Sequence, residues 1–344
     1  MPTRGVISPS PEEGDRQFET ALRPVTLADF TGQPKVKEIL SIAIQAALAR
    51  GEAMDHVLLH GPPGLGKTTL AAIVAQELGA PFDQTSGPVL QKKLDLTGIL
   101  SNIRERQVFF IDEVHRLMMD VEEMLYSALE DYRVDIVIGA GPGARTHSLP
   151  IPRFTCVAAT TRQGLVSAPM RGRFGLVLRL NHYDVDDMTK IVTRSAALLE
   201  VCIDPAGALE IGRRARGTPR IANRLLRRVR DFAQVRAAGK IDLGVAQQAL
   251  DLLEVDRYGL DEVDRKLMLA ILQNYGGGPV GLNTLAAALD EQAETIEEVY
   301  EPYLIQLGFL DRTPRGRIAT ERAWDYFKVT RRAGGGPQPS LFDS

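Results

Sequence analysis

The segment HGPPGLGKTT, residues 60–69, constrains the fold of this chain more than any other feature. Residues 61–68 match the pattern G-x-x-x-x-G-K-[ST], an apolar run precedes them, and a helical pattern (69–78) follows. In this strand–loop–helix context, the backbone N–H groups of a glycine-rich loop converge on phosphate oxygens, and the positive end of the helix faces the same anion. The segment therefore predicts a phosphate-binding loop in a parallel-sheet domain of the α/β class.

Each residue of this loop has an expected task. Gly64 and its glycine neighbours let the backbone curl around the phosphates. Lys67 can reach the β- and γ-phosphates, the Thr68 hydroxyl can ligate Mg²⁺, and Thr69 would contact the region of the α-phosphate. The loop thus predicts a phosphate site that also takes Mg²⁺.

The apolar run VFFIDE, residues 108–113, ends in two carboxylates. As a buried parallel strand, it would place Asp112 and Glu113 at the carboxyl edge of the sheet, where ligands bind in open α/β folds. Asp112 would hold Mg²⁺ through water, and Glu113 would orient or deprotonate the attacking water. Acidic residues after a strand are often only a solvated strand end, but with a complete phosphate loop they supply what phosphate hydrolysis needs.

Two more features bear on this site. The run FTCVAATT (154–161) predicts a third buried strand, whose terminal Thr161 either senses the γ-phosphate or caps the strand. Arg220 follows Thr218 and Pro219 at a predicted helix start, where a cation opposes the helix dipole. We therefore expect an anion such as a phosphate to hold Arg220, and most other arginines of residues 213–230 to lie on a solvated helix face.

The chain of 344 residues is too long for one typical domain, and its patterns change twice. Strand and helix patterns alternate within residues 1–183, of which the first 18 or so are expected to be disordered. Purely helical patterns fill residues 184–254, and residues 257–330 add a strand–turn–strand to three helices. The tail 331–344 is rich in Gly and Pro and is predicted to be disordered.

Composition indicates a cytoplasmic globular protein. The net charge is −3, no apolar run approaches the ~20 residues that span a bilayer, and the polar N-terminus does not resemble a signal peptide. Cys156 and Cys202 both lie in apolar runs and are expected to be reduced core residues.

Residues 132–154, YRVDIVIGAGPGARTHSLPIPRF, predict a hairpin with a Gly-rich tip. It is either an ordinary excursion of the sheet or a docking surface, because it would expose Ile136, Val137 and Ile138.

The stretch LDRTPRGRIAT, residues 310–320, predicts the wing of a winged helix. Pro314 and Gly316 would shape a turn from which Arg312, Arg315 and Arg317 project. The turn is either a solvated basic loop or a grip on duplex phosphates, which positions DNA without reading its sequence.

These motifs together resemble the RuvB family of AAA+ ATPases, the bacterial motors that drive branch migration of Holliday junctions. The resemblance rests on RPVTLADFTGQ, GPPGLGKTTLA, FFIDEVHRL, SALEDYRVDI, ATTRQGLVSAPMRGRFG, RGTPRIANRLLRRVRDFA, GLDEVDRKLM, GGPVGLNTLAAAL and EPYLIQLGFLDRTPRGRIAT. It covers about residues 20–330 and includes the C-terminal segment, whereas the phosphate loop and VFFIDE alone would indicate only an AAA+ ATPase.

The resemblance implies that ATP and Mg²⁺ bind to a large ATPase domain, which a helical lid and a winged-helix head follow. Leu22 and Arg23 would line the adenine pocket, and Tyr183 would touch the nucleotide. Thr161 would be the first sensor of the γ-phosphate and Arg220 the second.

The family also implies residues that act between subunits. Glu130, Asp131 and Tyr132 would lie close to the nucleotide or to the neighbouring subunit. Arg173 would be the arginine finger offered to the ATP of the next subunit, with Arg171 the less favoured candidate.

The partners implied by the resemblance are the duplex arms of a Holliday junction, RuvA, RuvC and further copies of the chain in a homohexameric ring. The hairpin would dock on RuvA, and the wing would contact DNA. The tail segment QPSLF, residues 338–342, is either a random tail end or a peptide similar to those that bind the bacterial sliding clamp.

Two other functions compete with a DNA motor. A clamp loader or protein-remodelling ATPase would use its third segment for oligomerisation and would lack the arginine turn. A winged-helix transcription factor is disfavoured because the helix TIEEVYEPYLIQLGF is acidic and apolar, without a basic face for a major groove.

Overall fold

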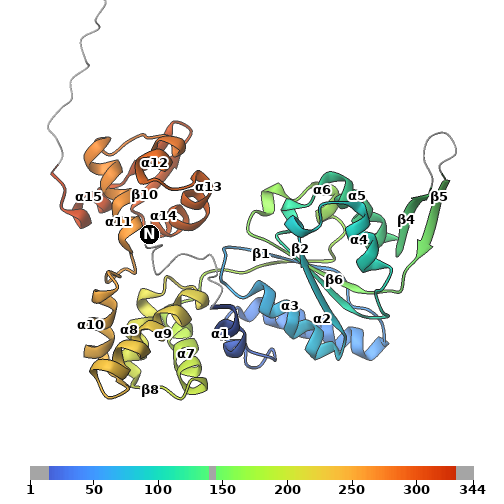
Figure 1. Cartoon of the computed structure of the whole chain (residues 1–344), viewed down its shortest axis with the longest axis horizontal. Coiled ribbons are helices and arrows are strands. Elements are labelled where there is room, and N and C mark those ends of the chain that lie inside the picture. Colours follow the sequence, from blue (N-terminus) through green and yellow to red (C-terminus); the bar gives the residue numbers. More distant parts are fainter. Residues whose placement is uncertain (1–14, 139–144, 331–344) are drawn as a thin grey trace, which may run out of the picture. The chain divides into compact units, whose positions relative to one another are not determined.

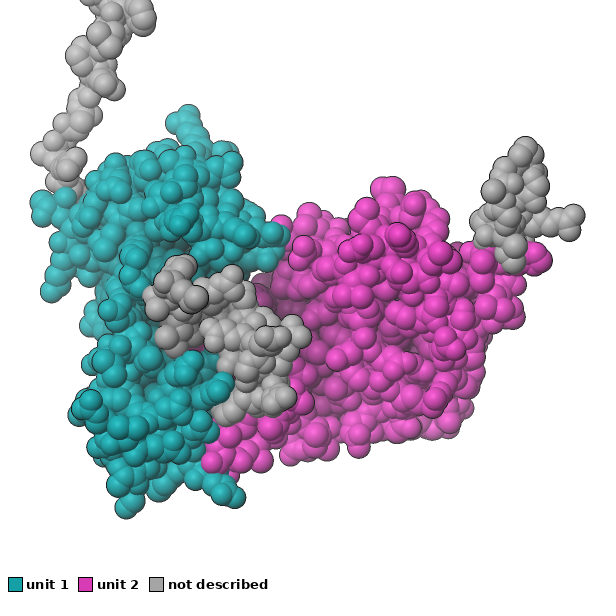
Figure 2. Space-filling model, in the orientation of Figure 1, with its two compact units in different colours: residues 1–11, 200–216, 224–344 teal, residues 12–199, 217–223 magenta. Residues whose placement is uncertain are grey.

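The computed structural model of the chain describes residues 15–138 and 145–330, and these form two compact units (Figure 2). Among the described residues, unit 2 covers 15–199 and 217–223, and unit 1 covers 200–216 and 224–330. Unit 2 therefore contains residues 184–199, which the sequence patterns placed in the helical segment. The Arg194 guanidinium donates to the Leu22 carbonyl at 2.8 Å and ties residues 184–199 to the N-terminal part of this unit, and the Ser195 hydroxyl donates to Asn223 Oδ1 at 2.8 Å.

The sheet of unit 2 has five parallel strands in the order β2–β3–β6–β1–β7 (Figure 1). Their bounds are β1 Val57–His60, β2 Phe82–Ser86, β3 Val108–Asp112, β6 Thr155–Thr160 and β7 Leu176–Arg179. The three strands predicted from apolar runs are confirmed as β1, β3 and β6. The edge strands β2 and β7 carry polar and exposed residues, so apolar runs did not reveal them.

Helices cover both faces of this sheet, with α2 and α3 on one side and α4 and α5 on the other (Figure 1). The helical elements of unit 2 are α1 Asp15–Leu22, α2 Pro34–Arg50, α3 Lys67–Leu78, η1 Gly87–Val89, α4 Lys93–Leu100, η2 Val114–Arg116, α5 Met119–Glu130, η4 Gln163–Leu165, α6 Ala168–Arg171 and α7 Val185–Leu198. The predicted helix 34–51 is confirmed as α2. In contrast, α1 begins at Asp15 and corrects the expectation of disorder through residue 18.

The strand order decides where the site lies. Strand β6 pairs with β1 on one side and with β3 on the other, all in parallel. Parallel pairing puts the carboxyl ends of the three strands at one edge of the sheet. The phosphate loop after β1, the carboxylates after β3 and Thr161 after β6 are therefore neighbours, although they are far apart in the chain.

Unit 1 contains a helical part and a winged helix. Its elements are β8 Cys202–Ile203, α8 Pro205–Arg214, most of α9 Pro219–Arg236, β9 Lys240–Ile241, α10 Leu243–Leu252, α11 Glu262–Leu269, η5 Ala270–Asn274, α12 Leu282–Leu289, α13 Ala293–Thr295, η6 Ile296–Tyr300, α14 Glu301–Gln306, β10 Leu310–Thr313, β11 Gly316–Ala319 and α15 Glu321–Phe327. The predicted winged helix is confirmed, with its own core around Met268, Leu304 and Phe309. Cys202, expected in the core, is exposed on a two-residue strand.

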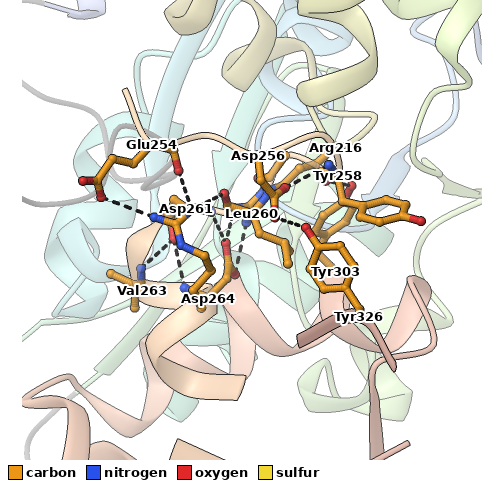
Figure 3. A network of polar contacts seen from close by, with 12 residues as sticks. Arg216, Glu254, Asp256, Tyr258, Leu260, Asp261, Val263, Asp264, Tyr303 and Tyr326 are labelled. Carbon is orange, nitrogen blue, oxygen red and sulfur yellow. Dashed lines mark hydrogen bonds and ion pairs between the residues drawn. The ribbon is translucent and has the colours of Figure 1, made fainter. Parts of the chain in front are cut away.

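A buried ion pair joins the two parts of unit 1 (Figure 3). The Arg216 guanidinium donates to both oxygens of Asp264, and its Nε donates to the Gly259 carbonyl at 2.7 Å. Arg214 is also buried, and it pairs with Glu210 and Asp251 at 2.7 Å each. These two arginines correct the expectation of a solvated face, because each is compensated by an acid that lies elsewhere in the sequence or one helical turn away.

Removing Arg216 tests how much the pair stabilises this unit. Burial raises the pKa of Asp264 to about 7, although the Arg216 charge favours the carboxylate. In Arg216→Met that pKa rises further, because the buried carboxylate loses its counter-ion. Truncating one partner of such a pair costs about 3–5 kcal/mol, which chemical unfolding would detect.

The pH dependence provides the control for this prediction. When a carboxyl has a raised pKa in the folded state, the protein loses stability as the pH rises toward that pKa and loses no more above it. Because the pKa of Asp264 is higher in Arg216→Met than in wild type, the variant continues to lose stability above about pH 7, and the stability gap between the two proteins should widen there. Arg213→Met, whose side chain is 56% exposed, should show no such gap. A constant gap between pH 6 and 8.5 would contradict the assignment.

Candidate nucleotide-binding site

The phosphate loop has the backbone that its glycines predict. Gly64 and Gly66 have positive φ angles of 78° and 99°, which L-residues rarely adopt. A Cβ atom at Gly64 would lie 2.8 Å from Thr218 Cγ2, so a larger residue would be strained and would displace Thr218. Helix α3 begins at Lys67, and its free N–H groups therefore face the loop.

Lys67 is held across the loop by neutral groups. Its Nζ donates to the carbonyls of Gly61 and Pro62 at 2.8 and 2.9 Å, and the residue is 7% exposed. Burial lowers the pKa of Lys67 to about 8, while the charges of Asp112 and Glu113 oppose this shift. An anion at the loop would restore the ammonium form, and a phosphate is such an anion.

The acidic end of β3 connects directly to the sensor strand. Glu113 has a left-handed backbone (φ 49°), and its Oε2 accepts from the Thr161 hydroxyl at 3.3 Å. The same oxygen lies 3.3 Å from His115 Nδ1, and His115 is 2.9 Å from the Thr160 hydroxyl. Thr161 and His115 thus both contact the Glu113 carboxylate, and His115 was not predicted. The pairing of β3 with β6 brings them together.

A pocket in unit 2 collects most of the predicted nucleotide residues. The residues that line it include Leu22, Arg23, Gly64, Lys67, Thr68, Thr69, Asp112, Glu113, Tyr183 and Arg220. Leu22 is buried at 3% exposure, and burial lowers the pKa of Arg23. The Tyr183 hydroxyl donates to the Leu65 carbonyl at 3.0 Å and connects the start of the lid to the loop.

The pocket also contains residues that the sequence patterns did not indicate. Among them are Phe30, Ile191, Arg194 and Asn223. Arg194 donates to the Leu22 carbonyl at 2.8 Å and thereby fixes one wall. The DFTGQ motif contains Phe30 and could have revealed it, but the other three lie on helices whose spacing only marks a buried face.

Arg220 has an acidic partner within its own chain. Its Nε lies 3.3 Å from Glu19 of α1, and its backbone N–H donates to the Gly64 carbonyl at 3.4 Å. The expected anion is therefore a carboxylate here. Arg220 still lines the pocket beside the phosphate loop, as a γ-phosphate sensor would.

Arg173 and the LEDY segment form a separate cluster. Arg173 Nη2 lies 2.8 Å from Glu130 Oε2, and Asp131 pairs with Arg133 at 3.2 Å. None of Glu130, Asp131 and Arg173 is among the residues that line the pocket. The ring of Tyr132 packs on Phe154 at 6.0 Å between centroids, so it faces its own core rather than that pocket. Arg171 donates to the Gln163 carbonyl at 3.3 Å.

The predicted hairpin is present as β4 Arg133–Ile138 and β5 Arg145–Pro150, which extend from unit 2 (Figure 1). Ile136 is half-buried against the core and is less exposed than expected. The tip, residues 139–144, lies outside the described residues, as do the side chains of Val137 and Ile138.

The wing separates its three arginines. Arg315, at the turn between β10 and β11, is exposed. Arg312 is half exposed and pairs with Glu297. Arg317 is 9% exposed and forms a bidentate pair with Glu301 at 2.5 and 3.1 Å. This corrects the expectation that Arg317 projects outward, because its side chain packs against the acids of η6 and α14.

No helix within residues 15–138 and 145–330 is long and apolar enough to cross a membrane. The tail segment 338–342 lies outside the described residues.

The fold and the phosphate site define a P-loop ATPase of the AAA+ type with a helical lid and a winged helix. Three family domains match consecutive parts of the chain: the Holliday junction DNA helicase RuvB P-loop domain at residues 22–180, the RuvB AAA lid domain at 183–256 and the RuvB C-terminal winged helix domain at 257–328. The chain belongs to the RuvB family.

Individual relatives agree with this assignment. The Holliday junction branch migration complex subunit RuvB of Solibacter usitatus is 71% identical, and the match covers 100% of both chains. The corresponding subunit of Koribacter versatilis is 65% identical over 94% of this chain and 90% of that protein. The solved Thermotoga maritima RuvB Holliday junction branch migration motor has a TM-score of 0.82 at 50% identity, covering 90% of this chain and 99% of that one.

The pKa of Lys67 gives a testable property of this site. At pH 8.5 much of Lys67 is neutral, and bound phosphates favour its charged form. ATP binding should therefore take up a proton at pH 8.5, and affinity should fall as the pH rises above about 8. Calorimetry in buffers of different ionisation enthalpy measures this uptake. Lys67→Arg is the control, because its guanidinium stays charged, and equal uptake in both proteins would place the proton elsewhere.

Proposed function

We propose that this chain is an ATP-driven motor that moves duplex DNA and branch-migrates Holliday junctions. The observation that carries the proposal is the combination of a complete phosphate site in unit 2 with a winged helix in unit 1, in a chain that matches RuvB domains over its described length. The clamp-loader alternative has no use for the wing, and residues 257–328 belong to the RuvB winged-helix family.

The site fits ATP with Mg²⁺. Lys67 is a buried cation whose hydrogen bonds are to carbonyl groups, so a triphosphate supplies the charge that the loop lacks. Thr68 and Asp112 both line the pocket and are suitable oxygen ligands for Mg²⁺. A bound Mg²⁺ would supply positive charge that stabilises the phosphates.

The residues around Glu113 suit hydrolysis of ATP. Glu113 would accept a proton from the water that attacks the γ-phosphorus as the bond to the bridging oxygen breaks. Thr161 and His115 fix the Glu113 carboxylate. Arg220 adds positive charge beside the loop, and Leu22, Arg23 and Tyr183 form the walls that hold the nucleotide.

We assign Arg173 to the nucleotide of the next subunit in a hexameric ring. The support is its position with Glu130, outside the residues that line its own pocket. Such a guanidinium stabilises charge that develops on the transferring phosphoryl group. Each site would then need two subunits. We also assign the β4–β5 hairpin, with Ile136, to the contact with RuvA, and RuvC joins the same complex at the junction.

The overall function is tested on synthetic four-way junctions. With ATP, Mg²⁺ and RuvA, the chain should convert such a junction to duplex products, and Glu113→Gln should bind ATP but lose the conversion by at least about 10²-fold. ATP turnover without junction conversion, in the presence of functional RuvA, would point to a remodelling ATPase instead.

The wing is the proposed DNA contact, and its arginines have unequal tasks. Arg315 is exposed at the turn, and Arg312 is half exposed, so both can reach phosphates. Arg317 forms its ion pair with Glu301, which is 1% exposed, and we infer that this pair stabilises the wing.

Two substitutions separate these tasks. Arg315→Ala should reduce the slope of log affinity against log salt by about one unit for every duplex sequence, with unchanged thermal stability. Arg317→Ala should instead destabilise the head by about 3–5 kcal/mol, since it leaves Glu301 buried without its partner. Titrations of labelled duplexes at several salt concentrations and thermal unfolding measure the two effects. The reverse pattern would refute the division of tasks.

A further inference from the structure

One face of helix α5 carries three polar side chains, Glu122, Tyr126 and Glu130, at four-residue spacing. Residues four apart lie above one another on a helix, so the three form a row, here called the α5 row. Arg173 contacts this row twice. Its Nη2 lies 2.8 Å from Glu130 Oε2, and its Cζ lies 4.4 Å from the centre of the Tyr126 ring.

Tyr126 is fixed from its far end. Its hydroxyl donates to Glu122 Oε1 at 2.5 Å and lies 2.9 Å from the Ser167 hydroxyl. Ser167 donates to the same Glu122 oxygen and caps α6 by accepting from the Met170 N–H at 3.2 Å. The ring is therefore attached both to α5 and to the turn that leads to Arg173.

The contacts of Arg173 with the α5 row use different parts of the guanidinium, and its Nη1 donates to the Pro169 carbonyl at 2.7 Å. Glu130 occupies an edge, where the N–H donors lie, and Tyr126 covers a face. The Glu130 side chain is 62% exposed, and such a surface ion pair is weak enough to exchange for another anion. The Nε of Arg173 is buried and has no hydrogen-bond partner among the described residues.

A phosphate that replaces Glu130 at the edge would leave the stacked face undisturbed, because hydrogen bonds lie in the guanidinium plane and stacking lies above it. A free arginine side chain samples many rotamers, and ordering them opposes catalysis. A finger that is already aligned avoids that cost when charge develops on the phosphoryl group.

We propose that Tyr126 is the positioning residue for the arginine finger: its ring is a platform that holds the Arg173 guanidinium in line for the nucleotide of the next subunit, while Glu122 and Ser167 hold the ring. This inference rests on the proposed function, in which Arg173 acts between subunits. Tyr126 itself touches no reacting atom.

The aromatic face is tested by two substitutions that both remove the hydroxyl. Tyr126→Phe keeps the ring, and Tyr126→Leu keeps apolar volume without a π face. In assembled rings on DNA, Tyr126→Leu should lower the kcat for ATP by about tenfold, whereas Tyr126→Phe should stay within about threefold of wild type. ATP affinity should be unchanged in both, because their own pockets are intact. Met119→Ala, at a 77% exposed position of α5, is the surface control and should have no effect. Equal kcat values for Leu and Phe would overturn the platform.

Subunit mixing decides whether the defect travels with the finger. Lys67→Ala lacks a working phosphate loop but presents an intact Tyr126 and Arg173. In a ring mixed with Tyr126→Leu, some interfaces pair the intact loop of one variant with the intact finger of the other. The kcat per intact loop should recover at those interfaces, which a defect in folding or in the subunit's own pocket would not allow.

The same mixture with Arg173→Ala separates the two proposals. If Arg173→Ala with Lys67→Ala recovers activity and Tyr126→Leu with Lys67→Ala does not, the platform is wrong and the intersubunit finger stands. If Arg173→Ala with Lys67→Ala stays inactive although the variants co-assemble, the finger assignment itself fails. Recovery in both mixtures supports Tyr126 as its positioning residue.

Discussion

The parallel pairing of β6 between β1 and β3 is the constraint on which the site depends. It brings the phosphate loop, the acidic end of β3 and Thr161 to one edge of the sheet. The contacts of Glu113 with Thr161 and His115 follow from this pairing. A shift of β6 by one residue would turn its side chains to the opposite faces of the sheet and would move Thr161 away from Glu113.

The fold also depends on buried arginines whose charge is neutralised by a paired carboxylate. The chain buries Arg216 against Asp264 and Arg317 against Glu301, and both pairs are nearly inaccessible. Desolvating such charges is costly, so each buried arginine requires a matched acid and additional hydrogen bonds. Arg315, at the turn of the wing, has no such partner among the described residues, and its charged group is exposed to solvent. Burial therefore separates arginines that support the fold from those that can bind phosphate.

The nucleotide pocket combines segments that are distant in the chain. Leu22 and Phe30 precede the phosphate loop, whereas Tyr183, Arg194 and Arg220 follow the sheet. The hydrogen bonds of Tyr183 to Leu65 and of Arg220 to Gly64 attach the later segment to the loop. Residues 217–223 therefore contact the phosphate loop directly, and Arg173 is not among the residues that line this pocket.

The sequence by itself determined the parts whose chemistry is local. Short patterns of residue type and spacing predicted the phosphate loop with its glycines and Lys67, and the strand that ends in Asp112 and Glu113. They also predicted the helix 34–51 and the order of elements in the winged helix. The family was also evident, because its motifs extend from the first strand to the wing.

Tertiary structure decided the rest. The sequence did not reveal the two edge strands, which carry polar residues, or the contact of Glu113 with His115. It also did not reveal the burial of Arg214, Arg216 and Arg317 or the stacking of Arg173 on Tyr126. These depend on which acid or ring a distant segment brings within a few ångströms, and a one-dimensional pattern gives a residue's neighbours along the helix or strand but not across the fold.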